Sequence, residues 1–292
     1  MPNNITTFQS YIPLLDEVYA SASLTAVLDG APELARQGVN ANELVIPKIS
    51  MDGLASYDRK SGYVDGEVTL TNETVICNFD RARLFCVDTM DNEETAGLAF
   101  ARLASEFIRT RVVPELDAFR LATYAGTDGI TAAAPADFGN GADVLTALRA
   151  ATNAMDEGEV PADQRYLFIT PSLLGLMEDL DLTKSTRVLE RFDAVVRVPQ
   201  SRMYTAITQY DGSSSGQTAG GYVKKAGGKN INFMVIHKPS VIQYQKHVAP
   251  KVITPEQNQT GDAWKFGYRN VGVADVYENK LAGIYLHAAT TL

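Results

Sequence analysis

The sequence of 292 residues predicts an α+β protein from which one long β-ribbon projects. The ribbon is indicated by two β-type runs, ELVIPKIS and EVTLTNETV, which are separated by the polar, glycine-containing stretch MDGLASYDRKSGYVDG. The remainder is indicated by helical and strand patterns that alternate from residue 127 to about 240, before the chain returns to β-type sequence after Pro239. No internal repeat is evident in the sequence.

The ribbon, residues 43–75, is hereafter called the tongue. Its linker is far too long for a tight hairpin turn. Folding the segment back on itself gives arms of about fifteen residues, or roughly 50 Å at a rise of ~3.3 Å per residue. That length is more than twice the radius of gyration of ~19 Å expected for a compact chain of this size. Because a two-stranded ribbon is marginally stable alone in water, we expect the tongue to lie across a neighbouring subunit.

The segment before the tongue predicts an arm with one helix. The first nine residues are polar, and YIPLLDEVYASASLTAVL then carries apolar residues at helical spacing. Gly30 and Pro32 end this pattern. We therefore expect residues 1–42 to form an N-terminal arm.

The stretch VICNFDRARLFCVD, directly after the tongue, predicts a short antiparallel pair that turns near Asp80 to Ala82. In that pairing Cys77 and Cys86 lie opposite each other, because both are equally far from the turn. We nevertheless expect both to remain thiols, since a cytosolic protein keeps its cysteines reduced.

A long spine helix is predicted next. Asp91 and Glu94 stand in the relation of a capping box, and the run ETAGLAFARLASEFIRTRVV that follows is rich in helix formers. The helical pattern continues past Pro114 and ends at Gly126. Because proline removes one backbone donor and clashes with the preceding turn, we expect a kink or a split of the helix at Pro114.

From residue 127 the patterns predict a compact α+β unit with a parallel or mixed sheet. The expected elements are, in order, the helix DVLTALRAATNAMDE, the buried strand RYLFITP, the helix SLLGLMEDL, and the strands VVRVP and NINFMVIHKP, the last two separated by the loose stretch QYDGSSSGQTAGGYVKKAGGKN. The closing part of the chain then predicts strands at VIQYQ, KVITP, WKFGYRNVGVADVY and AGIYLHAA.

The chain is acidic, with a net charge of −9 and a pI near 4.9. This balance argues against a protein that grips DNA or RNA, because phosphate binding depends on clustered Lys and Arg. No apolar run is long enough to span a bilayer, and the first basic residue, Arg36, comes too late for the charged region of a secretory signal. We therefore expect a cytoplasmic protein with no membrane partner.

One short motif points to an enzyme. Gly212 to Gly216 reads GSSSG and satisfies the G-x-S-x-G pattern of a hydrolase nucleophile at Ser214. That motif requires a strand before it and a helix after it, and the sequence predicts neither, so a flexible surface loop is the favoured interpretation. GNGADV near Gly139 and GGK at Gly227 to Lys229 lack the further residues of nucleotide-binding loops and are interpreted as turns.

No metal, cofactor or catalytic residue is predicted. The histidines His237, His247 and His287 lie in or beside strands at no ligand-like spacing, which favours ordinary hydrogen bonds. The acidic residues Asp88, Asp91, Glu93 and Glu94 lie at a helix start, where negative charge offsets the helix dipole without a bound cation. The aromatic residues Trp264, Phe266, Tyr268 and Tyr277 are expected in the core or at an interface.

Five stretches, taken together and in order, carry a family resemblance. They are IPKISMDGLASYDRKSGYVDGEVTL, DRARLFCVDTMDNEET, VPADQRYLFITPSLLGLM, INFMVIHKPSVI and PKVITPEQNQTGDAWKFGYRNVGVADVYENKLAGIYLHA. These stretches resemble the major capsid proteins of tailed bacteriophages, which have the shell fold first described in phage Hong Kong 97. The likeness covers nearly the whole chain and is strongest to coat proteins of phages that infect Gram-positive bacteria.

The resemblance implies the phage major capsid protein fold. Its expected parts are an N-terminal arm (1–42), the tongue as the extended loop (43–75), a peripheral domain with the spine helix (76–126 and 247–278), and an axial domain (127–246 and 279–292). Contacts between subunits are expected at the tongue residues Tyr57, Asp58, Arg59, Lys60 and Tyr63, and a hinge that adjusts shell curvature is expected at Pro114.

The function implied is that of a structural subunit, not an enzyme. Copies would assemble into hexamers and pentamers of an icosahedral shell that encloses double-stranded DNA without sequence-specific binding. Some family members begin with a cleaved scaffolding segment of roughly a hundred residues, whereas here the tongue starts by about Glu43. A separate scaffolding protein and a portal are therefore the expected partners. The expected location is the virion capsid, after synthesis and assembly in the cytoplasm of the bacterial host.

Two alternatives remain open. An encapsulin-like compartment would use the same fold to enclose a protein cargo instead of a genome. A soluble hydrolase that uses Ser214 is the more distant alternative.

Overall fold

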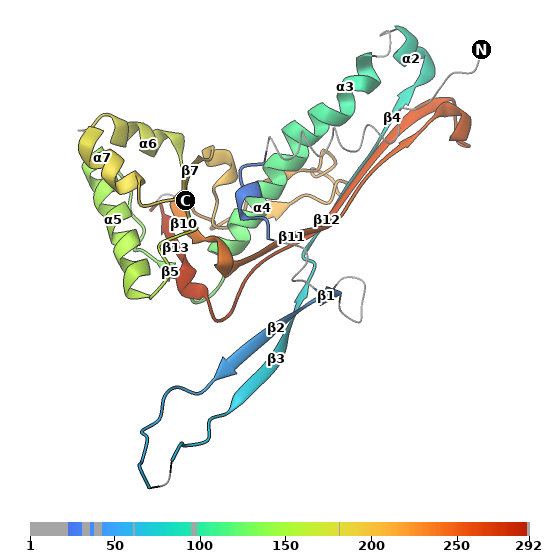
Figure 1. The fold of residues 1–292 in the computed structure, drawn as a ribbon. Coiled ribbons are helices and arrows are strands. Elements are labelled where there is room, and N and C mark those ends of the chain that lie inside the picture. Colours follow the sequence, from blue (N-terminus) through green and yellow to red (C-terminus); the bar gives the residue numbers. More distant parts are fainter. Residues whose placement is uncertain are drawn as a thin grey trace.

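The computed structural model describes residues 23–30, 36–37, 43–60, 62–94, 98–180 and 182–290. Over these residues the chain mixes helices and strands, as the sequence predicts. Figure 1 shows two lobes, each built on a β-sheet, and a thin ribbon that projects from the junction between them.

The first lobe contains a five-stranded mixed sheet with the order β5-β13-β10-β6-β7. Its strands are β5 (Thr131–Ala132), β6 (Arg165–Ile169), β7 (Ala194–Arg197), β10 (Ile231–His237) and β13 (Ile284–Ala288). The central strand β10 pairs antiparallel with β6 and with β13, whereas the outer pairings of β6 with β7 and of β13 with β5 are parallel. Every residue of β10 is buried, because packed layers cover both faces of the sheet.

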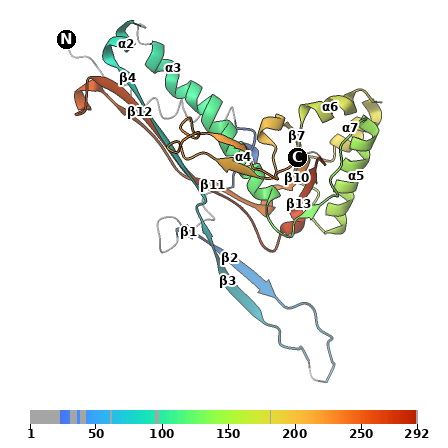
Figure 2. The same ribbon diagram turned by 180° about the vertical axis from the view of Figure 1, so that it is seen from behind.

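Helices cover one face of this sheet, as Figures 1 and 2 show from opposite sides. They are α5 (Gly141–Glu157), α6 (Pro171–Glu178) and α7 (Leu182–Leu189). Apolar residues of α5 at helical spacing, Val144, Leu148 and Met155, are buried in one core with the sheet residues Leu167 and Phe233. The sequence patterns predicted α5 and α6, but not α7.

The second lobe contains a three-stranded antiparallel sheet with the order β11-β12-β4. Its strands are β4 (Phe79–Asp88), β11 (Val241–Ile253) and β12 (Ala263–Val276). The register of β11 with β12 shifts between Gln245 and His247, so the predicted domain boundary after residue 246 falls at a bulge inside one strand. The division into domains stays a prediction.

The predicted antiparallel pair at residues 75–88 is wrong. One continuous strand, β4, pairs with β12 from Phe79 opposite Gly272 to Asp88 opposite Ala263. Pairing along its whole length with the long strand β12 satisfies far more backbone groups of this segment than a short hairpin would.

The cysteines are therefore not opposite each other. Cys77 precedes β4, whereas Cys86 lies within it, opposite Lys265. Both are free thiols, and Cys86 is exposed.

The spine helix lies along the three-stranded sheet (Figure 1). Its segments are α2 (Thr89–Glu94), α3 (Leu98–Phe107), the π turn η3 (Ile108–Val112) and α4 (Val113–Ala125). The predicted capping position is wrong by a few residues: α2 begins at Thr89, and the carboxylate of Asp88 accepts the N–H of Met90 at 2.9 Å. Ala104, Ile108 and Val113 of the helix share a core with Phe266 and Tyr268 of β12.

Short elements complete the described chain. They are the hairpin strands β8 (Ile207–Gln209) and β9 (Tyr222–Lys224), and the 3-10 turns η1 (Ala26–Leu28), η4 (Gln200–Arg202), η5 (Lys238–Ser240), η6 (Pro255–Gln257) and η7 (Leu281–Gly283). Of the predicted N-terminal helix, residues 11–22 lie outside the described residues, and the described end is the single turn η1.

The prediction of the tongue is confirmed. Its strands β2 (Glu43–Met51) and β3 (Val68–Ile76) pair antiparallel from Glu43 opposite Ile76 to Met51 opposite Val68, and a two-residue strand β1 (Arg36–Gln37) pairs beside β2. In Figures 1 and 2 the tongue points away from both lobes, and its distal half has no described element of the chain beside it.

Candidate intersubunit interface

The base of the tongue is fixed to the second lobe. Val75 is buried in a small core with Ile242 and Val273. The side chain of Asn78, between β3 and β4, donates to the carbonyl of Ala274 at 2.7 Å and accepts the N–H of the same residue at 3.1 Å. The side-chain amide of Asn78 thus makes the two hydrogen bonds to Ala274 that a backbone partner in a strand would make, and it fixes the end of the tongue to β12.

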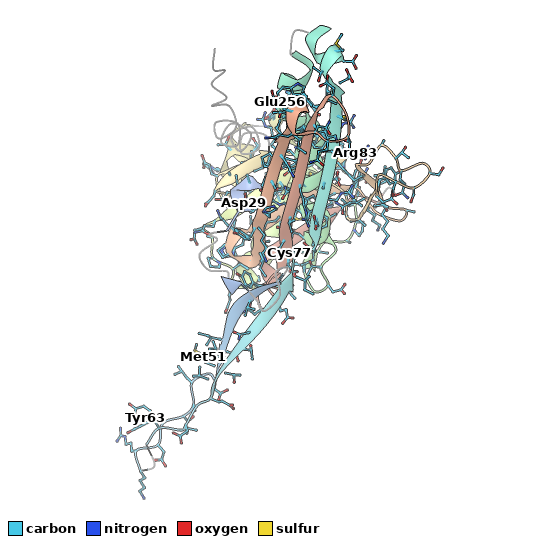
Figure 3. The ribbon with its side chains drawn as sticks, turned by 90° about the vertical axis from the view of Figure 1, so that its right-hand side faces the viewer. Asp29, Met51, Tyr63, Cys77, Arg83 and Glu256 are labelled. Carbon is cyan, nitrogen blue, oxygen red and sulfur yellow. The ribbon has the colours of Figure 1, made fainter. Side chains whose placement is uncertain are left out.

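The tip is a tight turn. Asp58 and Gly62 exchange backbone hydrogen bonds of 2.8 and 3.4 Å, and Gly62 has a φ of 82°, which favours glycine. The rings of Tyr57 and Tyr63 meet edge to face at 5.1 Å. Figure 3 shows Tyr63 at the far end of the tongue, Met51 part-way along it and Cys77 at its base.

The structure brings the predicted contact residues together at this tip. Tyr57, Asp58, Arg59, Lys60 and Tyr63 are all exposed. Their role in contacts between subunits stays a prediction.

The sequence analysis described the linker of the tongue as polar and did not predict that apolar side chains are exposed along both the linker and the arms. Of the thirteen large hydrophobic residues that are exposed within the described chain, eight lie on the tongue. They are Ile49, Met51, Leu54, Tyr57, Tyr63, Val64, Val68 and Leu70. The alternation of apolar residues at 49 and 51 and at 68 and 70 was the signal that could have revealed it.

The helix is not split at Pro114. Phe107, Val112 and Val113 all have right-handed helical dihedral angles, so the spine helix runs continuously from α3 into α4. The N–H of Val113 reaches back five residues to the carbonyl of Ile108, which makes a widened turn directly before the proline. Pro114, which has no N–H, thus enters a continuous helix at the first turn of α4.

A buried polar network, which no sequence pattern predicted, joins residues 23–30 to the spine helix. The carboxylate of Asp117 is fully buried and accepts from Ser23, from Thr25 and, at 3.0 Å, from Arg202. Arg120, also buried, forms an ion pair with Asp29 at 3.2 Å. Buried charges of this kind are retained where each has a partner.

A second polar cluster holds the loop between β8 and β9, residues 210–221, against β4. Glu115 of α4 accepts from Arg81 of β4 at 2.7 Å and from Gln209 of β8 at 3.3 Å. Burial raises the pKa of Glu115, and the guanidinium of Arg81 opposes that rise. Arg81 also donates to the carbonyl of Tyr210, and Arg83 donates to that of Thr218.

A groove of about 760 Å³ lies between this loop, β4 and the spine helix. Aromatic side chains line it together with Arg81, Arg111, Glu106 and Glu115. Three acidic residues line it: Glu106 is paired with Arg109, Glu115 is paired with Arg81, and Asp211 accepts hydrogen bonds from Ser213 and Ser214.

The geometry around Ser214 gives a hydrolase no support. The hydroxyl of Ser214 donates to the carboxylate of Asp211, which also accepts the backbone N–H groups of Ser213 and Ser214. These hydrogen bonds lower the pKa of Asp211 to about 2, which makes it an ionised turn acceptor and a poor general base. The motif lies in a loop between β8 and β9, without the helix that a nucleophile elbow requires.

The histidines of the first lobe make ordinary hydrogen bonds. His237 lies 3.2 Å from the hydroxyl of Ser240, and His287 lies 3.2 Å from the amide of Asn232. Burial lowers the pKa of both imidazoles. Within the described ranges, no three His, Cys, Asp or Glu residues are grouped as a metal site would need, and no helix is both long and apolar enough to cross a bilayer.

Comparison with known proteins decides the fold. No family model matches the sequence, and no curated protein matches it. A virus-like particle from Pyrococcus furiosus matches with a TM-score of 0.61 and 12% identity, over 97% of this chain and 100% of the other. A protein of Mycobacterium phage Che8 matches with a TM-score of 0.59 and 12% identity, over 89% of both chains. The capsid structure of cyanophage P-SCSP1u matches with a TM-score of 0.57 and 11% identity, over 88% of this chain and 86% of the other.

The chain has the fold of phage capsid proteins. The α+β fold that the resemblance implied is therefore confirmed. The matches cover most of both chains, so the likeness in fold extends over the greater part of this chain.

Proposed function

We propose that this chain is the structural subunit of a tailed-bacteriophage capsid. Copies assemble into hexamers and pentamers, and these close an icosahedral shell around double-stranded DNA. The observation that carries the proposal is the capsid-protein fold combined with a tongue that is exposed along most of its length and whose distal half has no described element of its own chain beside it. Such a ribbon is marginal in water, so a neighbouring subunit is its natural support.

The shell is held together by many weak contacts between subunits, which repeat at every boundary. Each tongue crosses a subunit boundary, and a closed shell multiplies every such contact by the number of boundaries. The N-terminal arm acts as a second strap, and the residues Tyr57 to Tyr63 contact the neighbour at the tip.

Shell curvature is set by small differences between otherwise identical subunits. We assign the hinge to Pro114, because the widened turn at Ile108–Val112 directly before it gives the helix a locally irregular hydrogen-bond ladder. Helices of hexamer and pentamer subunits in one particle should differ in direction across residues 110–118. If the helix followed the same path in both kinds of subunit, Pro114 would not be a hinge.

The enclosed DNA is contained without sequence-specific binding. The net charge of −9 leaves the chain without the excess of Lys and Arg that phosphate binding requires. A separate scaffolding protein and a portal complete the expected partners. Assembly takes place in the host cytoplasm, and the finished subunit is located in the virion capsid.

An encapsulin-like compartment is the second candidate. The match to the virus-like particle from Pyrococcus furiosus, which covers all of that chain, favours it. The two functions share the shell and differ in its content.

Electron microscopy of the purified chain, alone and co-expressed with a candidate scaffolding protein, tests the proposal. Closed particles of uniform diameter with fivefold and sixfold units are expected. Nuclease-protected DNA inside native particles supports the capsid, whereas a packaged protein without DNA supports the compartment. A chain that remains monomeric under all these conditions would overturn both functions.

A further inference from the structure

We propose that the groove between β4, the spine helix and the loop at residues 210–221 binds a small organic acid. The ligand carries one carboxylate, one planar amide and an apolar or aromatic body, because the side chains of the groove offer a partner for each of these groups. This binding site goes beyond the structural function proposed above and does not depend on it, since one subunit supplies every residue that lines the groove.

A buried carboxamide without a partner lines the groove. Asn270 of β12 is only 1% exposed, and neither its side-chain nitrogen nor its side-chain oxygen has a hydrogen-bond partner among the described residues. A buried polar group without a partner destabilises a protein, so native structures contain few of them and each requires a reason. A ligand amide offers one acceptor and one donor and would therefore satisfy both atoms of Asn270.

One cation of the groove is also without a partner. Arg81 and Arg83 are engaged, because they donate to Glu115 and to carbonyl groups of the loop. Arg111 of η3, by contrast, is exposed and makes no hydrogen bond or ion pair within the part of the chain that the structure describes. A guanidinium presents its donors in a planar fork that matches a carboxylate. Arg111 is therefore placed to bind the anionic group of a ligand.

Aromatic rings lie between these two polar groups. Tyr268 and Asn270 are two residues apart on β12, so their side chains point to the same side of the sheet. The ring of Phe107 on α3 lies 6.2 Å from that of Tyr268 and 4.8 Å from that of Phe85. Arg111 follows Phe107 by about one turn of the spine helix, so the two share one side of it. An apolar or aromatic body that contacts these rings can thus reach the carboxamide at one end and the guanidinium at the other.

The size of the groove suits a small molecule. Its volume of about 760 Å³ falls within the range of small-molecule sites, which are mostly apolar and contain a few placed polar groups. The loop that forms one wall is held to β4 by the hydrogen bonds of Arg81 and Arg83. The site is therefore formed before any ligand arrives.

The acidic residues of the groove limit the charge of the ligand. Glu106, Glu115 and Asp211 line the groove together with the arginines. A phosphate monoester carries a charge of about −1.5 to −2 near neutral pH and would be repelled by these carboxylates. Arg111 can offset a single negative charge. A carboxylic acid is therefore a better ligand than a nucleotide.

Calorimetric titration of the purified chain tests the ligand class. The probe is N-acetylphenylalanine, which carries the amide, the ring and the carboxylate, and its dissociation constant should be about 1 mM or lower. Two related probes each lack one group. We expect 3-phenylpropionate, without the amide, and N-acetylphenylalaninamide, without the carboxylate, to bind at least about fivefold more weakly.

Variants of the two polar residues test the site. Asn270→Leu should weaken binding of N-acetylphenylalanine at least about tenfold, while the urea midpoint of unfolding stays equal or rises because an unpaired buried amide is removed. A purely structural role of Asn270 would instead lower that midpoint. Arg111→Gln should weaken binding about fivefold. Its matched control is Arg109→Gln, which should stay within about twofold of the wild type because Arg109 is paired with Glu106 and does not line the groove.

Three results would overturn the inference. The first is no detectable binding of N-acetylphenylalanine at about 10 mM. The second is binding that neither Asn270→Leu nor Arg111→Gln weakens, which would place the probe elsewhere on the chain. The third is tighter binding of adenosine monophosphate than of N-acetylphenylalanine, with loss of that binding in both variants, which would make the ligand a nucleotide and not a carboxylic acid.

Discussion

The central strand of the five-stranded sheet and the arms of the tongue are both antiparallel strands, but they use apolar residues in opposite ways. Every residue of β10 is buried. On the tongue, Ile49, Met51, Val68 and Leu70 are each more than half exposed. Apolar side chains in β10 stabilise the folded subunit, whereas those on the tongue contribute only when another molecule covers them. Substitutions in the two regions should therefore separate folding from assembly.

Removal of the tip, Ser56 to Asp65, should show this separation most strongly. We expect no closed particles, because in the proposed shell the deleted residues are those that reach furthest across the subunit boundary. The subunit itself should remain folded, since residues 56–60 and 63–65 are exposed and contribute no buried apolar area. Circular dichroism and sedimentation velocity measure the two effects independently.

A linker variant serves as the control for this deletion. Replacement of the same ten residues by glycine and serine keeps the length of the tongue but removes the native side chains. It therefore shows whether assembly depends on the length of the tongue or on the side chains at its tip. An unfolded deletion protein would mean that the tip belongs to the core of the fold. Full-sized particles in normal amounts would mean that it is dispensable.

Phe233→Ala in β10 should have the opposite effect. Phe233 is fully buried and its ring stacks on Tyr285 with centroids 6.4 Å apart. Loss of a buried aromatic ring should lower the free energy of unfolding by about 3–5 kcal/mol. Urea denaturation measures this loss, with the exposed Leu84→Ala as a control expected to change stability by less than about 0.5 kcal/mol. A Phe233→Ala loss below about 1 kcal/mol would contradict the two-sided packing of the sheet.

Asp117→Asn tests how much the buried polar contacts between residues 23–30 and the spine helix contribute to stability, in comparison with the apolar core around Phe233. The amide keeps the shape of the carboxylate but weakens its contact with Arg202 and presents donors to the hydroxyls of Ser23 and Thr25. We expect a loss of about 2 kcal/mol in the free energy of unfolding. Asp80→Asn, which disrupts an exposed pair with Arg269, should cost under about 1 kcal/mol. Equal losses in both variants would show that burial adds nothing to the Asp117 contacts.

Charge reversal at the tip should have a milder, salt-dependent effect. Arg59→Glu with Lys60→Glu should lower particle yield at low salt if acidic residues of the neighbour face the tip. The defect should shrink as salt rises, because exposed charges are screened over ~8–10 Å at physiological ionic strength. Light scattering across a salt series measures it. A defect of the same size at every salt concentration would exclude charge as its cause.

The smallest effect concerns the two thiols. Burial raises the pKa of Cys77, whereas Cys86 is exposed on β4, so Cys86 should be alkylated several-fold faster near neutral pH. Mass spectrometry of native protein measures the two rates. A quantitative Cys77–Cys86 disulfide in non-reduced particles would contradict the prediction that both remain thiols.

Sequence patterns predicted the elements whose signals are local. The helix α5 has apolar residues at helical spacing, and β6 and β10 are short apolar runs, so both types were visible without a structure. The strand β4 was misread as a hairpin because its real partner, β12, lies far along the chain and no local pattern reveals that pairing. The helix α7 was missed because its sequence, LTKSTRVL, is largely polar.

The candidate interface was predicted only in part. The length of the tongue and the residues of its tip followed from the sequence. The exposed apolar side chains of its arms were not predicted, although their alternation is visible in the sequence, and only the register shows that Met51 lies opposite Val68. The carboxylate of Asp117 was equally hidden, since its partners, such as Thr25 and Arg202, come from distant parts of the chain.

Because the tongue is attached at its base through Asn78, a small rotation there would produce a large displacement at its tip. The carboxamide of Asn78 is hydrogen-bonded to Ala274 on β12 at the point where β3 passes into β4, so any rotation of the ribbon about its base would be coupled to the sheet. For an arm of roughly 50 Å, a rotation of about 5° at this base moves the tip by ~4 Å. A slight change of twist in β12 would thereby be amplified into a displacement as large as one side chain at the tip of the tongue.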